Sequence, residues 1–289
     1  CRKTLLVLFL FHYLFSCGQI YVKDSFTSNA FPICFSRGTS SIIVSPDEEL
    51  SVKKTVGLFA EDLFRVTHTR AKIYTGREYK GKEVIVIGTI GKNPFIDRLI
   101  SKGKINVSAI RKGWEQYIIQ TVEKPQQGVD RALIVVGSDK RGTAYGLLSI
   151  SEAMGVSPYY WWADIPVRHQ SAVYLSGSIV SKKPSVKYRG IFINDEDWGL
   201  KPWATDNYEK GLGDIGPKTY SKVCELILRL RGNMLAPAMH SCTGAFYSHP
   251  ESKLVDDSFG IINTTSHCEP LLLNNAAKFT EHGTIDFRA

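Results

Sequence analysis

The sequence predicts an α/β protein, in which an N-terminal α/β sandwich is followed by the first part of a (β/α)₈ TIM barrel. Two observations carry this prediction. Runs rich in Val and Ile alternate with helical segments over residues 40–185, and strand-helix units then follow one another over residues 186–289. Successive strand-helix units are typical of parallel sheets. For the second part, the pattern alone also allows a doubly wound sheet.

The N-terminal part opens with "SSIIVS", which has the pattern of a buried strand. Ser45 is then expected to be a helix N-cap, with Pro46 as the first helical residue and Glu48 closing a capping box. The apolar residues that follow are spaced by four and three: Val52, Val56, Phe59, Leu63 and Val66. Such a stripe predicts a helix that lays one face on a sheet.

Further strands are predicted where Val and Ile gather, in "EVIVIGTI" and "RALIVVGSD". The segment "EQYIIQTVE" alternates like a half-exposed strand. Helices are expected at about 94–101 and 142–154. Together these elements predict a mixed sheet covered by helices.

The segment "VVGSDKRGTAYG" places Gly137 and Gly142 between a strand and a helix, as phosphate-binding loops do. Its spacing fits neither the Walker pattern nor G-x-G-x-x-G. We therefore favour a tight strand-to-helix turn, with Asp139 near the helix start.

Four consecutive aromatic residues, Tyr159 to Trp162, lie in "SPYYWWADIPV". Such a cluster can stack on sugar rings, or it can dock the first part of the chain on the second. We favour docking, because indole and phenol groups suit an interface with one dry and one wet side.

The second part repeats a strand-helix pattern. The predicted strands are "YRGIFIN", "NMLAPAMH" and "IINTTSH". The predicted helices are "PKTYSKVCELILRLRG", closed by Gly232, then "HPESKLVDDSFG", closed by Gly260, and the start of a third in "CEPLLLNNAAKF". Three such units fit the beginning of a (β/α)₈ barrel.

Residues 1–18 have the features of a secretory signal peptide, since Arg2 and Lys3 precede a short apolar run and small residues. A cut after Gly18 fits, and so does a lipid anchor at Cys17 in a bacterial lipoprotein; a buried helix is the alternative. We expect a secreted, periplasmic or outer-surface protein with no membrane span. The chain starts with Cys1, which suggests a fragment of a reading frame, and its cysteine spacing indicates no disulfide framework.

The formal charge of +8 makes an acidic partner plausible: nucleic acid, an anionic surface or an acidic sugar. The Lys and Arg residues are dispersed and form no basic run. No nucleic-acid partner is therefore expected.

Polar and titratable residues follow all three predicted strands of the second part. They are Asn194, Asp195, Glu196 and Asp197 after the first, His240 after the second, and His267, Cys268 and Glu269 after the third. In a parallel barrel, chemistry gathers at the carboxyl ends of the strands. Three such ends in phase predict a functional site.

Paired carboxylates at a barrel mouth are the equipment of glycoside hydrolysis, in which one protonates the leaving oxygen and the other activates water or attacks the anomeric carbon. Asp195 and Glu196 are the catalytic candidates. Neighbours in an extended segment point to opposite sides, so we expect one to face the pocket and the other to brace it. Asp197 is expected to be solvated or to cap a helix.

The candidate substrate-binding residues are Asn194, His240, His267 and Glu269. A histidine at a strand end can be a core residue, but at a shared rim it can hydrogen-bond a sugar hydroxyl or carboxylate. No metal is expected, because the ligands would come from separate strands without a local spacing. Cys268 is not expected to act as a nucleophile with its neighbour His267.

Four strings carry a close resemblance to glycoside hydrolase family 115, the xylan α-1,2-glucuronidases: "KYRGIFINDEDWGLKPWA", "GNMLAPAMHSCTGAF", "TSHCEPLLLNN" and "GSDKRGTAYGLLSISEAMGVSPYYWWADIPV". The resemblance extends from about Ser40 to the end. It implies an α/β domain (40–185) packed on a (β/α)₈ barrel (186–289 being its start). It also implies a secreted bacterial enzyme that needs no cofactor and removes glucuronic acid, or its 4-O-methyl form, from glucuronoxylan or its oligosaccharides by an inverting mechanism.

By the same resemblance, an acidic residue of "INDE", Asp195 or Glu196, belongs to the family's pocket, together with His240 and His267. Family members are far longer, and their general acid is implied to lie beyond Ala289. The chain alone is therefore expected to be inactive, and a homodimer of the full-length protein is left open. The alternative function is that of a non-catalytic, secreted glycan-binding protein that uses the aromatic segment.

Overall fold

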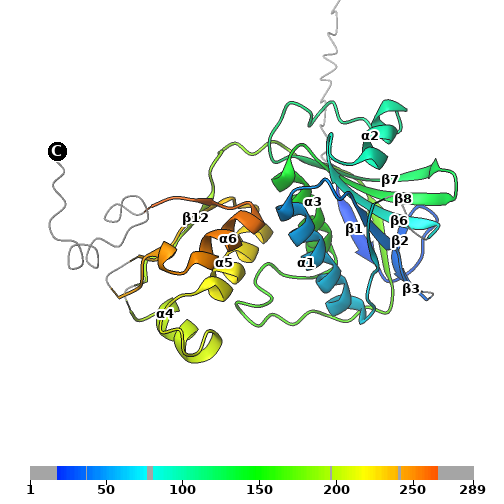
Figure 1. Ribbon diagram of the computed structural model, residues 1–289. Coiled ribbons are helices and arrows are strands. Elements are labelled where there is room, and N and C mark those ends of the chain that lie inside the picture. Colours follow the sequence, from blue (N-terminus) through cyan, green and yellow to red (C-terminus); the bar gives the residue numbers. More distant parts are fainter. Residues whose placement is uncertain (1–17, 37, 77–80, 196, 240–241, 266–289) are drawn as a thin grey trace, which may run out of the picture.

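The computed structural model describes residues 18–36, 38–76, 81–195, 197–239 and 242–265 (Figure 1). We call residues 18–180 the N-terminal region and residues 181–265 the C-terminal region. The predicted signal peptide lies outside the described residues except for Gly18. Within the described part of the chain, no helix is long and apolar enough to cross a membrane.

A six-stranded mixed sheet forms the centre of the N-terminal region. Its strands run in the order β10 (Ile179–Val180), β7 (Tyr117–Gln126), β8 (Val129–Gly137), β6 (Glu83–Thr89), β4 (Ser41–Val44) and β5 (Ile73–Thr75). The last four are parallel, and β7 is antiparallel to β8 and β10. Strands β6 and β8 are buried on both faces, which explains their continuous Val and Ile runs. The predicted mixed sheet is confirmed.

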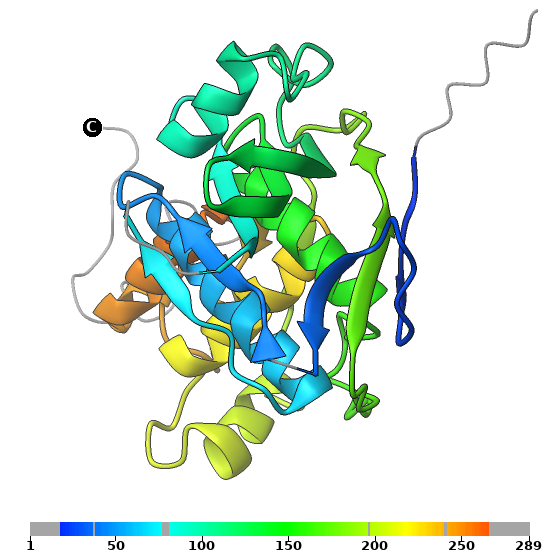
Figure 2. The same ribbon diagram turned by 90° about the vertical axis from the view of Figure 1, so that its right-hand side faces the viewer.

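Helices cover both faces of this sheet. Helices α1 (Leu50–Thr67) and α3 (Lys140–Ala153) lie on one face, and α2 (Pro94–Ser101) packs on the other (Figures 1 and 2). All five residues of the predicted α1 stripe are buried in the core. The side chain of Asn93 caps α2 by accepting hydrogen bonds from the amides of Phe95 and Ile96.

A second, antiparallel sheet packs against the same core. Its order is β1 (Ile20–Lys23), β9 (Val173–Gly177), β2 (Phe31–Phe35) and β3 (Gly38–Thr39). The sequence analysis assigned no strand to residues 20–39. These strands are short, and β1 and β2 pair with β9, which lies roughly 140 to 160 residues later in the chain.

The predicted start of the first helix is wrong. Helix α1 begins at Leu50, and Ser45 instead accepts a hydrogen bond from the amide of Asp47 in the turn that precedes it. The carboxylate of Glu48 is buried and accepts hydrogen bonds from the amide (2.7 Å) and hydroxyl (3.0 Å) of Thr89. A contact with β6 therefore replaces the local capping box.

The glycine-containing turn before α3 is tightly packed. Asp139 caps α3 by accepting a hydrogen bond from the amide of Gly142 at 2.9 Å. A Cβ atom on Gly137 would lie 2.2 Å from the amide nitrogen of Thr143, and one on Gly142 would lie 2.2 Å from the carbonyl oxygen of Gln116. Both glycines are thus needed for close packing, which supports the turn over a phosphate-binding loop.

The C-terminal region contains three parallel strands in sequence order, β11 (Gly190–Phe192), β12 (Met234–Ala236) and β13 (Ile262–Asn263). Helix α5 (Pro217–Arg229) connects the first two, and α6 (Pro250–Phe259) the last two. A short α4 (Leu200–Trp203), a π-turn (Ala204–Tyr208) and a 3₁₀ turn (Phe246–Ser248) complete it. The described elements confirm the predicted alternation of strands and helices. The predicted third helix lies outside the described residues.

The ends of the two helices differ in detail. Gly260 closes α6 with a left-handed φ of 69°, as predicted. After α5, however, the left-handed residue is Arg231 (φ 60°), and Gly232 donates the closing hydrogen bond to the carbonyl of Ile227 at 2.7 Å.

The aromatic segment docks the two regions together, as favoured above. The hydroxyl of Tyr160 donates to Glu225 of α5 at 2.9 Å, and the indole of Trp162 donates to the carbonyl of Lys222 at 3.2 Å.

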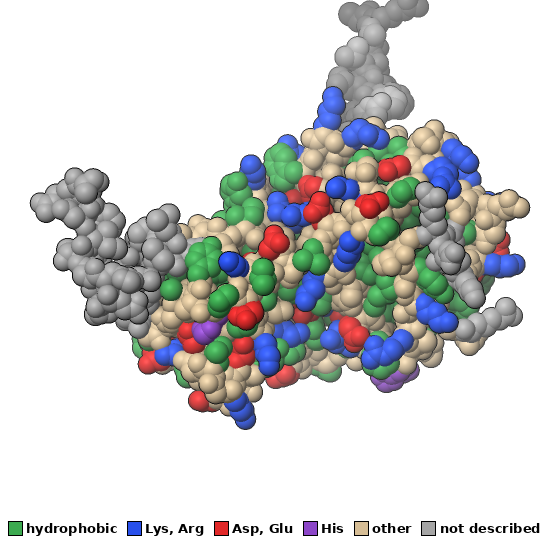
Figure 3. All heavy atoms as spheres, viewed as in Figure 1, with side chains coloured by type: hydrophobic (Ala, Val, Ile, Leu, Met, Phe, Trp, Pro, Cys, Tyr) green, Lys and Arg blue, Asp and Glu red, His purple; other side chains and the backbone are tan. Residues whose placement is uncertain are grey.

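The surface charge is dispersed, as the sequence indicated. Over the face shown in Figure 3, basic and acidic side chains are interspersed.

Asp256 on α6 is a buried carboxylate between α5 and α6. Burial raises its pKa to about 6, and hydrogen bonds from Cys224 and Asn263 offset only part of this shift. The folded state therefore binds the proton more tightly than the unfolded state, for which the pKa is near 3.8. The contribution of Asp256 to the free energy of unfolding is therefore most favourable below pH 3.8 and is lost as the pH rises through about 6.

Asp256→Asn is thus expected to stabilise the protein at pH 7 by roughly 3 kcal/mol, because a pKa shift of one unit corresponds to about 1.4 kcal/mol. At pH 4 the difference from wild type should nearly vanish. Denaturant unfolding of both proteins at the two pH values measures it. A difference that does not change with pH would show that Asp256 does not titrate in this range.

Candidate functional site at the carboxyl ends of the parallel strands

The carboxyl ends of β11 and β12 lie side by side, as the sequence predicted. The parallel register pairs Phe192 with Ala236 at the end of both strands. Beyond this point, the thiol of Cys242 donates a hydrogen bond to the backbone carbonyl of Asp195 at 3.4 Å. The ammonium group of Lys201 donates to the carbonyl of Cys242. The loops after the first two strands therefore meet at one rim.

Asp195 is buried at this rim, with 4% of its surface exposed. Its two carboxylate oxygens accept hydrogen bonds from the backbone amides of Gly199 (3.3 Å) and Lys201. A carboxylate held by two backbone donors fixes the loop that leads into α4. Asp195 thus makes the bracing contacts that we expected of one of the two adjacent carboxylates.

Asn194 and Asp197, two neighbours of Asp195, are exposed at the same edge. Asp197 has a left-handed φ of 70°, which turns the chain, and its carboxylate lies 3.7 Å from the ammonium of Lys201. The expectation of a solvated Asp197 is confirmed, while Asp195 takes the capping role.

The other predicted site residues, Glu196, His240, His267 and Glu269, lie outside the described residues. Their roles stay predictions.

The structure also shows a histidine-aspartate contact that the sequence analysis missed. The imidazole Nε2 of His249 lies 2.9 Å from the carboxylate of Asp214, which also accepts from the amide of Gly244. Asp214 precedes α5 and His249 precedes α6, so this contact joins the loops after β11 and β12. The partners are 35 residues apart, and no local motif marks them.

Residues 181–289 match the model of glycosyl hydrolase family 115. The solved structure of BtGH115A, described as a family GH115 4-O-methyl-α-glucuronidase with specificity for decorated arabinogalactans, is similar with a TM-score of 0.73. The two are 34% identical, over 89% of this chain and 32% of that one.

The chain belongs to glycoside hydrolase family 115.

This family 115 chain spans about a third of the length of BtGH115A. A second solved structure, CpGH84D, has a TM-score of 0.50 at 11% identity, over 84% of this chain and 35% of that one, and shows a shared fold alone. No curated protein matches the chain.

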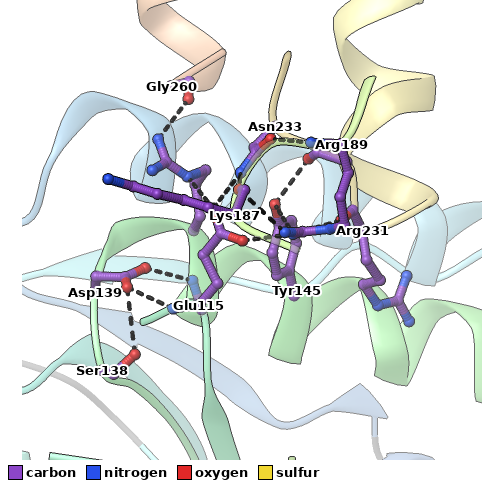
Figure 4. Close-up of polar contacts among 12 residues, drawn as sticks. Glu115, Ser138, Asp139, Tyr145, Lys187, Arg189, Arg231, Asn233 and Gly260 are labelled. Carbon is purple, nitrogen blue, oxygen red and sulfur yellow. Dashed lines mark hydrogen bonds and ion pairs between the residues drawn. The ribbon is translucent and has the colours of Figure 1, made fainter. Parts of the chain in front are cut away.

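A buried charge network of the family 115 chain is centred on Glu115 and lies at the opposite, amino ends of the strands (Figure 4). The carboxylate of Glu115 accepts from Arg141 (2.6 Å) and Asn233 (2.7 Å) at one oxygen and from Arg189 (2.5 Å) at the other. Arg189 and Asn233 directly precede β11 and β12. The cluster joins residues of the N-terminal region to residues of the C-terminal region, so we assign it to the packing of the two regions.

Among residues 18–265, where the structure describes them, no three His, Cys, Asp or Glu side chains come close enough to hold an ion. At the described rim, the exposed polar side chains include those of Asn194 and Asp197.

Proposed function

We propose that the protein carrying this chain is an α-glucuronidase, which removes glucuronic acid or its 4-O-methyl form from a polysaccharide. The observation that carries the proposal is the 34% identity to a 4-O-methyl-α-glucuronidase over 89% of this chain. The resemblance noted in the sequence suggests glucuronoxylan as the polymer. The specificity of BtGH115A makes a decorated arabinogalactan the second candidate.

We propose further that β11, β12 and β13 begin a (β/α)₈ barrel. The three strands lie in the sheet in the same order as in the sequence. In a doubly wound sheet, the strand order would reverse at a switch point. In addition, apolar residues of α5 and α6 share one hydrophobic cluster with Tyr145 and Leu148 of α3. Both helices therefore lie on the same side of the three-stranded sheet. A ring of helices outside a closed barrel requires that arrangement.

The proposed reaction is a single displacement with inversion. One carboxylate activates water while a carboxylic acid protonates the leaving oxygen, and the two groups are separated by about 6.5–9.5 Å. Because the carboxylate of Asp195 is occupied by backbone amides, we assign the group that faces the sugar to Glu196. Asn194, His240, His267 and Glu269 would bind the sugar hydroxyls and carboxylate. A location outside the cytoplasm fits a polymeric substrate.

Glu196→Gln and Asp195→Asn test this division of roles in the protein expressed from its complete reading frame. Glu196→Gln should lower kcat for uronic acid release by about 10²–10⁴-fold, as expected for a lost general acid or base, without changing the melting temperature. Asp195→Asn, in contrast to Glu196→Gln, should lower the free energy of unfolding by about 1–3 kcal/mol, because the new amide NH₂ would face a backbone N–H.

Asp197→Asn is the matched control, since this exposed neighbour should leave both kcat and stability near wild type. If Glu196→Gln keeps wild-type turnover, the assignment of Glu196 is wrong. If the wild-type protein binds the glycan but releases no uronic acid, the non-catalytic glycan-binding alternative replaces the enzyme.

A further inference from the structure

A hollow lined by tryptophans lies beside the predicted site. Its walls are Trp161, Trp162, Asp164, Gly199, Leu200 and Trp203, and its volume is about 560 Å³. We call it the tryptophan hollow. This volume falls within the range of small-molecule sites, about 300–1,000 Å³. Part of the wall comes from α4, which projects at the lower edge of the C-terminal region in Figure 1.

The chain concentrates its tryptophans here. Of its five tryptophans, three line the hollow, and a fourth, Trp198, precedes the wall residue Gly199. Trp198 is 80% exposed. Folding gains nothing from an indole left in water, whereas indoles contribute strongly to binding when a ligand covers them.

Docking of the two regions does not explain all of these rings. Trp162 serves the interface through its hydrogen bond to Lys222. Trp161 and Trp203 also meet across this interface, edge to face with ring centroids 5.6 Å apart, yet both remain half-exposed. Trp203 is stacked on Tyr208 at 5.7 Å, which holds the ring in a fixed position. Rigid, half-exposed indoles form a platform for the C–H face of a sugar ring.

The charge of the hollow selects the kind of sugar. The exposed carboxylate of Asp164 can accept hydrogen bonds from hydroxyl groups and would repel an anionic uronate. The nearby ammonium of Lys222 lies 5.2 Å from the centre of the Trp161 ring, but it pairs with Glu225 at 3.0 Å. The hollow therefore suits a neutral pyranose rather than glucuronate.

The hollow is also tied to the strand-end site. Its wall residue Gly199 donates to the carboxylate of Asp195, so Asp195 fixes both the rim and the wall of the hollow. We propose that the tryptophan hollow is a subsite for a neutral sugar unit of the polysaccharide backbone, next to the unit that bears the glucuronate. The proposal rests on the proposed function for its substrate.

Calorimetric titration of the protein from its complete reading frame tests the subsite independently of catalysis. The probes are undecorated xylo-oligosaccharides, undecorated galacto-oligosaccharides and free glucuronic acid. One of the neutral series should bind, and which one does identifies the backbone. Trp203→Ala should weaken this binding by about tenfold, and Asp164→Ala by about two- to tenfold.

Trp114→Phe is the matched control, because Trp114 lies in the N-terminal region outside the hollow, and it should leave the affinity unchanged. If Trp203→Ala does not fold, the exposed Asp164→Ala carries the test. Binding of neither neutral series, equal binding by wild type and both hollow variants, or competition of glucuronic acid for the same site would overturn the proposal. Binding without uronic acid release would support the subsite while refuting the proposed activity.

Discussion

Asp62→Ala is expected to reduce the free energy of unfolding by about 3–5 kcal/mol, the usual effect of removing one partner of a buried ion pair. Asp62 on α1 is fully buried, and its two oxygens accept hydrogen bonds from both terminal nitrogens of Arg229 on α5 at 2.9 Å. The side chain of Arg229 is only 3% exposed. The variant would leave this guanidinium with Glu225 as its remaining carboxylate partner.

Glu61→Ala is the matched control, because Glu61 precedes Asp62 on the same helix and forms an exposed ion pair with Arg70 at 2.9 Å. Exposed pairs contribute at most about 1 kcal/mol. Chemical denaturation of the three proteins measures the difference. Equal unfolding midpoints for the two variants would show that the Asp62–Arg229 contact does not hold the two regions together.

Glu115→Ala is expected to have an effect of similar size, about 3–5 kcal/mol. The side chain of Glu115 is 1% exposed, and its carboxylate accepts hydrogen bonds from Arg141, Arg189 and Asn233 (Figure 4). Burial alone would raise the pKa of Glu115, but the hydrogen bonds from Asn233, Arg189 and Arg141 outweigh it and lower the pKa.

The sign of the pH dependence follows from this shift. The contribution of Glu115 to stability is fully present above the ordinary pKa of a glutamate, 4.5, and is lost as the pH falls through the lower pKa of the folded state. The difference between wild type and Glu115→Ala should therefore be large at pH 7 and shrink in acid. Glu152→Ala, which removes an exposed partner of Arg231, is the control. A small, pH-independent difference for Glu115→Ala would contradict a structural role for the network.

The sequence predicted the elements that depend on local pattern. The apolar spacing of α1 and the Val and Ile runs of β6 and β8 are visible within single windows of the chain, and the structure confirms them. It could not predict contacts made across the chain. Glu48 follows a strong capping signal, yet Thr89, 41 residues away, holds its carboxylate.

The site shows the same division. The parallel strands put the polar ends of β11 and β12 at one rim, as their sequence order predicted. Which of two adjacent carboxylates braces the loop was not predictable, because it depends on the left-handed turn at Asp197 and on the amides of Gly199 and Lys201. The contact between His249 and Asp214 was missed for a related reason, since it joins two loops that only the fold brings together.

The most direct test of the proposed α-glucuronidase is time-resolved ¹H NMR of the protein from its complete reading frame, with glucuronoxylan and a decorated arabinogalactan as substrates. The predicted result is release of uronic acid from at least one polymer, with the β-anomer appearing first and the α-anomer following by mutarotation, as inversion of an α-linkage requires. Release with the α-anomer first would contradict the inverting mechanism. No release from either polymer by the folded protein would contradict the proposed activity itself.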